Sequence, residues 1–386
     1  MRTPTRMDAV QTPIIPVLGA MIRANPGTIS LGQGVVHYGP PRAALDAVAQ
    51  ALGTAPINEY QDGSGLPSLL TRLAAKLAAE NGIELARGSC VMVTAGANMA
   101  FMHAVLAISE PGDEIVLNTP FYFNHDMAIG MAGCTAVCVP TDAAYQPQLE
   151  LLRAAITSRT RAIVTVSPNN PTGAVYAETT LRAVNDLCRE HGLYHLSDEA
   201  YEYFTYAPAR HFSPGSLPGA EAHTISLYSL SKAYGFAGWR IGYVAYPEHL
   251  ASAMAKIQDT ILICPTIASQ LAATAALDVG RLYCERHVTE LAKIRDIVAA
   301  RLSALAPLVQ MPAADGAFYC LLKVNTDVDP MTLAERLIRE HQVAVIPGSA
   351  FGMTEGCSFR VAYGAPQKAT VAEGIARLVG GLRALA

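Results

Sequence analysis

Residues 229–242 read Ser229-Leu230-Ser231-Lys232-Ala233-Tyr234-Gly235-Phe236-Ala237-Gly238-Trp239-Arg240-Ile241-Gly242. This stretch follows an apolar, β-like run at 223–228, so Lys232 is expected at the carboxyl end of a strand, where α/β folds bind ligands. Small hydroxyl residues and glycines surround the lysine, so little side-chain bulk blocks an approaching ligand. Arg240 adds a fixed positive charge nearby. The stretch therefore predicts an α/β fold with a ligand site at Lys232.

Two interpretations of this stretch are open. In the first, Lys232 forms a Schiff base with pyridoxal 5′-phosphate (PLP), and Ser229 and Arg240 hold the phosphate. In the second, the lysine and the arginine are ordinary solvated side chains in a glycine-rich loop. The Ser-x-Ser-Lys motif alone does not separate the two. The full spacing through Arg240 and Gly242 favours the first.

Composition limits the class of protein. The chain has 386 residues, of which 51% are apolar and 16% charged, and its net charge is −4. This apolar content is enough for a large core and is too high for a disordered chain. The charge balance gives no sign of binding to nucleic acid or to an anionic membrane. The length favours two domains.

The cysteines and the chain start bear on the compartment and on metals. The eight cysteines are scattered, without zinc-type spacing, so we expect reduced thiols and no metal site. The first residues carry Arg2, Arg6 and Asp8 and no apolar signal core, which predicts a cytoplasmic protein. The longest uncharged stretch, 260–277, contains Pro265 and Gln270, which favours a buried helix or subunit contact over a membrane span.

The order of elements predicts an α/β architecture. Residues 1–30 carry four prolines and are expected to be irregular. The apolar patch at 14–18 is expected to form an arm that packs on another surface, such as that of a partner subunit. From residue 89 strands and helices alternate, which predicts a mostly parallel sheet covered on both faces. The expected strands are 91–94, 114–117, 135–139, 161–166, 193–196, 223–228 and 241–245.

The carboxyl-terminal part is expected to form a smaller unit. After residue 247 the pattern is helical to about 306, and the run 280–305 is expected to link two domains. Strand, helix, strand and helix patterns follow. The predicted division is 1–40 for an N-terminal arm and part of the small domain, 41–285 for the large domain and 286–386 for the small α/β domain.

Unusual polar residues follow the expected strands. Gly96-Ala97-Asn98 opens a helix whose free N–H groups can receive a phosphate. Tyr122, in Pro-Phe-Tyr, could stack on a flat ring, and Asn170 could donate to a phenolate-like oxygen. Asp198 could pair with a protonated pyridine nitrogen and Tyr201 with a ring hydroxyl. Each has a simpler alternative. The glycine at 96 can belong to an ordinary α/β loop, Tyr122 to the core and Asn170 to a turn. Asp198 can be a helix N-cap or a metal ligand.

Arg360 lies between Phe359 and Val361 in an apolar strand, and a buried arginine usually has an anionic partner. That partner is either a substrate α-carboxylate or a nearby acid in an internal salt bridge. The glycine pattern at 96–98 is not Gly-x-Gly-x-x-Gly, which argues against a nicotinamide dehydrogenase.

Together these residues resemble the class I/II aminotransferases of fold type I. The motifs occur in that family's order along nearly the whole chain: Gly34, Tyr60, Gly96-Ala97-Asn98, Tyr122, Asn170-Pro171-Thr172-Gly173, Asp198 with Tyr201, Ser229 to Lys232, Arg240 and Arg360. The resemblance implies a PLP-binding large domain with a seven-stranded, mostly parallel sheet, and a smaller α/β domain.

The resemblance also implies a role for each cofactor-binding residue. Lys232 binds PLP covalently and then moves the proton. Asp198 pairs with the pyridine nitrogen, and Tyr201 and Asn170 bind the ring oxygen. Tyr122 stacks on the ring. The phosphate is bound by Gly96, Ala97, Asn98, Ser229 and Arg240. Tyr60 contacts the phosphate bound in the other subunit, which implies a homodimer with shared active sites.

For the substrate, the resemblance implies that Gly34, Asn170 and Arg360 bind the α-carboxylate of an amino acid. Tyr122 stands where aspartate aminotransferases carry tryptophan, and residues 32–41 look most like members that act on aromatic amino acids or methionine. Residues 260–270 offer no arginine for a second carboxylate. We therefore expect transfer of an α-amino group from a neutral L-amino acid to a 2-oxo acid.

Several alternatives on the same fold remain open. These are a β-elimination or ring-forming lyase, an amino-acid oxidase, and an aminotransferase of the aspartate/prephenate type, since fold does not fix the reaction. A non-catalytic PLP-binding regulator is less favoured, because such proteins carry a DNA-binding helix-turn-helix module and none is evident.

Overall fold

The computed structural model describes residues 6–312, 314–365 and 367–386. Its larger sheet has seven strands, in the spatial order β2 (Ser89–Thr94), β8 (Gly242–Pro247), β7 (Thr224–Ser229), β6 (Tyr194–Asp198), β5 (Thr160–Val166), β3 (Glu114–Thr119) and β4 (Thr135–Pro140). All neighbours pair in parallel except β8, which is antiparallel to both β2 and β7. The predicted mostly parallel, seven-stranded sheet is confirmed.

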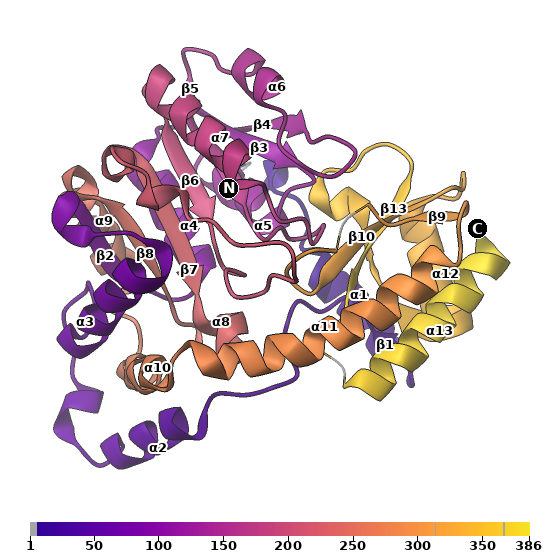
Figure 1. Ribbon diagram of the computed structural model, residues 1–386, viewed down its shortest axis with the longest axis horizontal. Helices are drawn as coiled ribbons and strands as arrows, with labels where there is room; N and C mark the ends of the chain where they lie inside the picture. Colours follow the sequence, from indigo (N-terminus) through magenta and orange to yellow (C-terminus); the bar gives the residue numbers. More distant parts are fainter. Residues whose placement is uncertain (1–5, 313, 366) are drawn as a thin grey trace, which may run out of the picture.

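Side chains of this sheet alternate between its two faces, and helices cover both faces (Figure 1). On one face Ile115, Leu117 and Val164 pack against α4 (Ala97–Ile108), α5 (Phe123–Met131) and α9 (Ala251–Ile261). On the other face Val116 and Ile163 pack against α6 (Leu149–Ala154) and α7 (Glu178–His191). Helices on both faces explain why the central residues of β3 and β5, at 115–117 and 162–164, are apolar and buried.

Three more helices complete the larger part of the fold. They are α2 (Arg42–Ala51), α3 (Pro67–Lys76), which continues as a π-helical turn (Leu77–Asn81), and α10 (Ile267–Val279). Helix α10 buries Ala272, Ala273 and Ala276 against α3 and the sheet, so most of the uncharged stretch forms a buried helix. Among the described helices, none is both long and apolar enough to cross a membrane.

A second group of elements surrounds a smaller sheet. Strands β12 (Ile346–Pro347), β13 (Cys357–Ala362), β10 (Tyr319–Val324) and β9 (Val309–Gln310) form one antiparallel sheet, and β1 (Ile29–Ser30) pairs in parallel with β11 (Val343–Ala344). Strands β11 and β12 follow each other closely in the chain but belong to different sheets. The 23-residue helix α11 (Arg281–Ser303) runs from α10 to this group (Figure 1). The boundaries at 40 and 285 stay a prediction.

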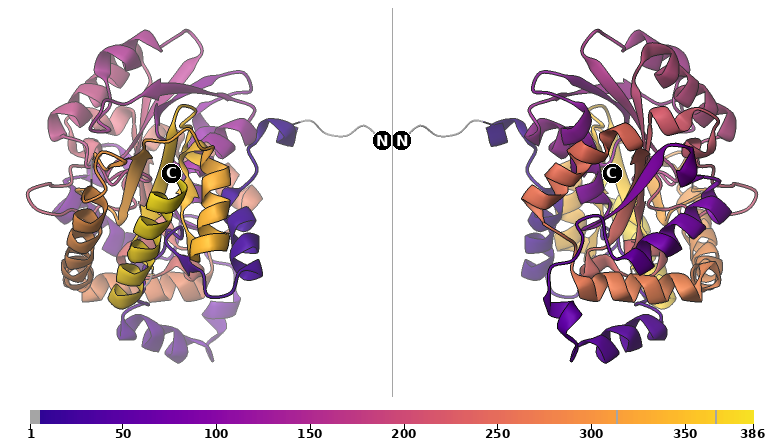
Figure 2. Two further views of the ribbon diagram at one scale, coloured as in Figure 1. Left: turned by 90° about the vertical axis from the view of Figure 1, so that its right-hand side faces the viewer. Right: turned by 90° about the vertical axis from the view of Figure 1, so that its left-hand side faces the viewer.

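The amino-terminal region corrects one expectation. Residues expected to be irregular form α1 (Ile14–Ala24), which lies beside α12 (Pro330–His341) and near α13 (Lys368–Leu385) in Figure 2. Pro13 and Pro16 are tolerated because N–H groups in the first helical turn have no helical acceptor. Leu18 is buried against Ile338 and other apolar residues of the same chain, whereas Ile15 is 36% exposed, so packing of the patch on a partner subunit stays a prediction. Residues 1–5 lie outside the described part.

Candidate active site

A cavity of about 400 Å³ lies at the carboxyl edge of the large sheet. Nine of the predicted site residues line it: Ala97, Asn98, Tyr122, Asn170, Asp198, Tyr201, Ser229, Lys232 and Arg240. A second cavity of about 350 Å³ adjoins it, shares Tyr122, Asn170, Tyr201 and Lys232, and adds Gly34 and Arg360.

Sheet geometry explains why these residues meet. The parallel strands β5, β6 and β7 end at one edge, where Val166, Asp198 and Ser229 are their last residues. Strand β8 runs the other way, and its first residue, Gly242, pairs with Ser229. The loop before β8, which carries Arg240, therefore reaches the same edge.

Lys232 lies in the four-residue helix α8 (Leu230–Ala233) directly after β7. The Ser229 hydroxyl caps this helix by accepting a hydrogen bond from Ser231 N at 3.1 Å. Burial, assisted by the nearby positive charge of Arg240, lowers the pKa of the Lys232 amine from 10.5 to about 8, although Asp198 opposes the shift. A larger fraction of this amine is therefore neutral and nucleophilic near neutral pH.

The positive end of the cavity is built from the start of α4 and from Arg240. Gly96 caps α4 with φ +83°, and a Cβ there would lie 2.5 Å from Arg240 Nη2, so a larger residue would be strained and would displace the guanidinium. Arg240 donates to Ala237 O at 3.0 Å and to Ala95 O at 3.2 Å. Free N–H groups and the helix dipole at Ala97 and Asn98 add to this charge, which suits a phosphate.

The negative end of the cavity is Asp198, the last residue of β6, which is 5% exposed. Its Oδ1 accepts from Ala200 N at 3.0 Å, and its Oδ2 lies 3.0 Å from His125 Nε2. His125 is buried and stacks on Phe101 with ring centroids 3.9 Å apart. The sequence analysis missed His125. A histidine within an apolar, buried helix was the available signal, since such a side chain needs a polar partner.

The carboxylate-binding candidate, Arg360, is buried in the second cavity at 2% exposure. It donates to Asn170 Oδ1 at 2.9 Å and to Gly32 O at 2.6 Å. Within the described residues it makes no ion pair, and its Nε has no hydrogen-bond partner. The internal salt bridge left open by the sequence is therefore absent from the described part of the chain, and the guanidinium remains available to an external anion.

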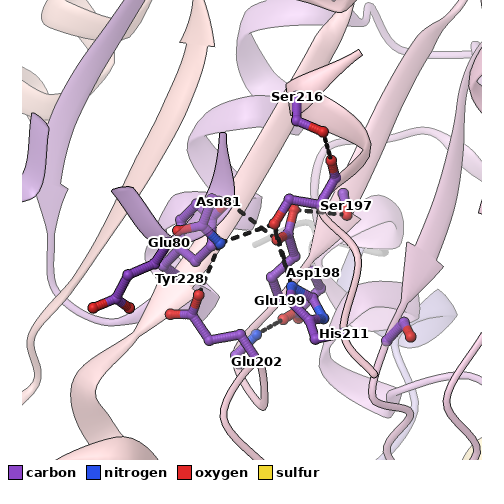
Figure 3. Close-up of polar contacts among 12 residues, drawn as sticks. Glu80, Asn81, Ser197, Asp198, Glu199, Glu202, His211, Ser216 and Tyr228 are labelled. Atoms are coloured by element: carbon purple, nitrogen blue, oxygen red, sulfur yellow. Dashed lines mark hydrogen bonds and ion pairs between the residues drawn. The ribbon is translucent and has the colours of Figure 1, made fainter. Parts of the chain in front are cut away.

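A buried polar network holds the loop after β6 through Glu199 and Glu202 (Figure 3). Glu199 accepts hydrogen bonds from Ser197 at 3.1 Å and from Tyr228 at 3.1 Å, and its Oε2 lies 2.9 Å from His211 Nε2. Three residues on, Glu202 pairs with the ammonium of Lys76. The acids at 199 and 202 thus anchor the loop that presents Asp198 and Tyr201.

Two predicted residues, Gly96 and Tyr60, line neither cavity, for different reasons. Gly96 sits one residue before the lining residue Ala97. Tyr60 is 80% exposed and lines neither cavity of its own chain, so its predicted contact with another subunit stays a prediction. Among the described residues, no cluster of three or more His, Cys, Asp or Glu side chains could hold a metal ion.

Comparison with known proteins gives consistent matches over the whole chain. The family model "Aminotransferase class I and II" matches residues 26–378. An aromatic aminotransferase, ISS1, from Arabidopsis thaliana is 35% identical over 97% of this chain and 94% of its own length. An aspartate aminotransferase from Pyrococcus abyssi is 32% identical over 93% and 92%. The solved structure of aspartate aminotransferase from Thermus thermophilus with maleate superimposes with a TM-score of 0.91 at 31% identity, covering 99% of this chain and 100% of that chain.

Proposed function

The chain belongs to the class I and II aminotransferases, and we propose that its amino donor is a neutral L-amino acid of the aromatic or methionine-like type. As a member of this family it is a PLP-dependent enzyme, whose substrates are an amino acid and a 2-oxo acid. The names of its relatives include both aromatic and aspartate aminotransferases, so they do not decide the donor.

The lining of the second cavity carries the donor proposal. Its cations are Lys232 and Arg360, and the first cavity adds only Arg240. If Arg360 takes the α-carboxylate while Lys232 and Arg240 serve the cofactor, no cation in the described lining is left for a side-chain carboxylate. Apolar and aromatic side chains line the rest of the second cavity, among them Ile15, Val35, Phe123 and Tyr319. Such a surface favours an uncharged side chain.

The donor set of the first cavity fits PLP. The space between Gly96 and Arg240, which a Cβ at Gly96 would fill, suits the phosphate. Asp198, at the negative end of the cavity, suits the pyridine nitrogen. Asn170 and Tyr201 offer hydrogen bonds to the ring oxygen, and Tyr122 offers a ring face. When bound, PLP supplies an electron-withdrawing ring that accepts the electron pair left at the α-carbon of the donor.

The proton transfer is assigned to Lys232. With a pKa near 8, its Nζ would act as the general base that takes the proton from the α-carbon of the donor and as the group that holds this proton for its return. Arg360 and Asn170 hold the α-carboxylate and so direct the α C–H bond toward Nζ. Burial of the site limits competition by water for these hydrogen bonds.

We also propose a cytoplasmic homodimer with shared active sites. The exposed Tyr60, at 80%, and the exposed apolar side chains Leu52 and Leu282, at 65% and 66%, support a subunit contact. All eight cysteines are free thiols, which supports a reducing compartment.

A spectral scan tests the donor. Purified protein with PLP is mixed with single amino acids, and the loss of the visible absorbance of the lysine-bound cofactor is followed. Phenylalanine, tyrosine or methionine should give a strong response and aspartate none. A response to aspartate alone would replace our proposal by an aspartate/prephenate-type donor.

Product analysis tests the reaction itself. Lys232→Ala should abolish both the visible absorbance and the turnover. The unmodified enzyme should form the 2-oxo acid without ammonia. Stoichiometric ammonia would favour elimination or oxidation, and normal transamination by Lys232→Ala would exclude the assignment of that lysine.

A further inference from the structure

We propose that Tyr319 is a positioning residue that couples the ring-oxygen site to the α-carboxylate site. Its hydroxyl directs the proton of Tyr201 toward the cofactor, and its ring fixes the plane of the Arg360 guanidinium. The inference rests on the proposed roles of Tyr201 and Arg360, and it concerns a residue that is absent from the sequence motifs and that the proposed function uses only as part of the cavity lining.

Tyr319 is held rigidly at the junction of the two sites. It is the first residue of β10, is fully buried, and lines the second cavity. A Cβ on Gly34 would lie 2.5 Å from the Tyr319 hydroxyl, and a Cβ on Gly173 would lie 2.2 Å from the Tyr319 carbonyl oxygen. Two glycines therefore make room for this tyrosine, so its hydroxyl has a closely defined position.

The hydrogen bonds around Tyr201 allow its proton to point away from Tyr319. The hydroxyl oxygens of Tyr319 and Tyr201 lie 2.8 Å apart, and Asn170 Nδ2 donates to Tyr201 at 3.4 Å. Within the described residues, Tyr201 is the one protein hydrogen-bond partner of the Tyr319 hydroxyl. A phenol has one proton and can accept two hydrogen bonds. When Tyr319 and Asn170 both donate to Tyr201, the proton of Tyr201 is free for an external acceptor.

That external acceptor is the ring oxygen of the bound cofactor. A hydroxyl that accepts hydrogen bonds is polarised and becomes a stronger donor. Tyr319 therefore strengthens the hydrogen bond from Tyr201 to the ring oxygen and stabilises negative charge on it. Loss of the Tyr319 hydroxyl should raise the pH at which the visible absorbance of bound PLP changes.

The aromatic face of Tyr319 has a second contact. The Cζ of Arg360 lies 4.7 Å from the ring centre of Tyr319 and 5.0 Å from that of Phe351. Two aromatic rings near a buried guanidinium provide cation–π attraction and restrict its rotation. Since Tyr319 touches both Tyr201 and Arg360, its two functions can be separated by substitution.

Two variants separate the hydroxyl from the ring. Tyr319→Phe removes only the hydroxyl. It should raise the midpoint pH of the absorbance change by roughly half a pH unit and leave the donor KM within about twofold of the unmodified value. Tyr319→Met also removes the aromatic face, and should raise the donor KM by about tenfold in addition. Tyr363→Phe is the matched control, because Tyr363 is equally buried but lines neither cavity.

The outcomes are distinct from those that test the proposed function. An unchanged titration in Tyr319→Phe would overturn the role of the hydroxyl, and an equal rise in KM for Tyr319→Phe and Tyr319→Met would overturn the role of the ring. Either result leaves transamination by Lys232 intact. A titration shift in Tyr363→Phe of the same size would show that any buried hydroxyl has this effect, and would also overturn the proposal.

Discussion

Replacing Lys76 by methionine should destabilise the fold strongly. The Lys76 ammonium pairs with Glu202 and donates to Asn81 Oδ1 at 2.7 Å, and the side chains of Lys76 and Glu202 are only 6% and 11% exposed. Methionine preserves much of the lysine volume but leaves the Glu202 carboxylate without its counter-charge. Removing one partner of a buried pair costs about 3–5 kcal/mol. Asn81 Nδ2 still donates to Glu202 at 2.9 Å, so we expect about 3 kcal/mol.

Denaturant unfolding of the PLP-loaded enzyme measures this loss, with every variant at one protein concentration. Adding Glu202→Gln to Lys76→Met removes the unpaired charge and should recover about half of the lost stability. Arg42→Met is the matched control, because the Arg42–Asp46 pair has a similar 2.8 Å contact with side chains 85% and 43% exposed. Its effect should stay below about 0.5 kcal/mol.

The reasoning would be refuted if Lys76→Met lost less than about 1 kcal/mol, or if the second substitution caused a further full loss of stability. In either case the loop that carries Asp198 and Tyr201 would owe its position to backbone contacts. The polar network in Figure 3 would then be incidental to the cofactor site.

Two further predictions concern cofactor loading. Because burial and Arg240 lower the Lys232 pKa to about 8, the rate at which apoenzyme binds PLP covalently should rise with pH and level off just above that value. A rate that still rises toward pH 10.5, the ordinary pKa of lysine, would contradict the shift. Gly96→Ala should weaken PLP binding by at least about tenfold, since its Cβ would lie 2.5 Å from Arg240 Nη2 at a φ of +83°. Gly53→Ala is the control, because open space surrounds that position. Equal PLP dissociation constants for Gly96→Ala and Gly53→Ala, measured by absorbance titration, would count against a phosphate site between Gly96 and Arg240.

The succession of strands along the chain and most of the residues around the first cavity could be predicted from sequence, because both depend on local patterns. Apolar runs with turn residues at their ends define buried strands, and parallel strands bring their carboxyl ends to one edge. Asp198, Ser229 and Asn170 all follow such runs, and the structure places them around one cavity. Their sequence positions were sufficient to predict that they meet.

Pairing direction and the amino-terminal helix could not be predicted in the same way. The connection from Ser229 to Gly242 holds 12 residues, a length that allows either a parallel crossover or an antiparallel return, so the direction of β8 does not follow from the sequence. The prolines at 13 and 16 indicate irregular chain in isolation, yet in the first turn of α1 they cost no helical hydrogen bond. Tertiary packing of Leu18 then decides the conformation.

The residues that sequence analysis found and missed differ in the cost of burying them. Arg360 was noticed because a charge in an apolar strand is expensive to bury, so its presence predicts a specific partner. Tyr319 lies in the neighbouring strand β10 in an equally apolar setting, but a tyrosine is cheap to bury and occurs in most cores. Only the 2.8 Å contact with Tyr201 and the stacking on Arg360 distinguish it from a packing residue. Positioning residues of moderate polarity will therefore escape sequence reasoning wherever their partners lie more than a hundred residues away, as Tyr201 does from Tyr319.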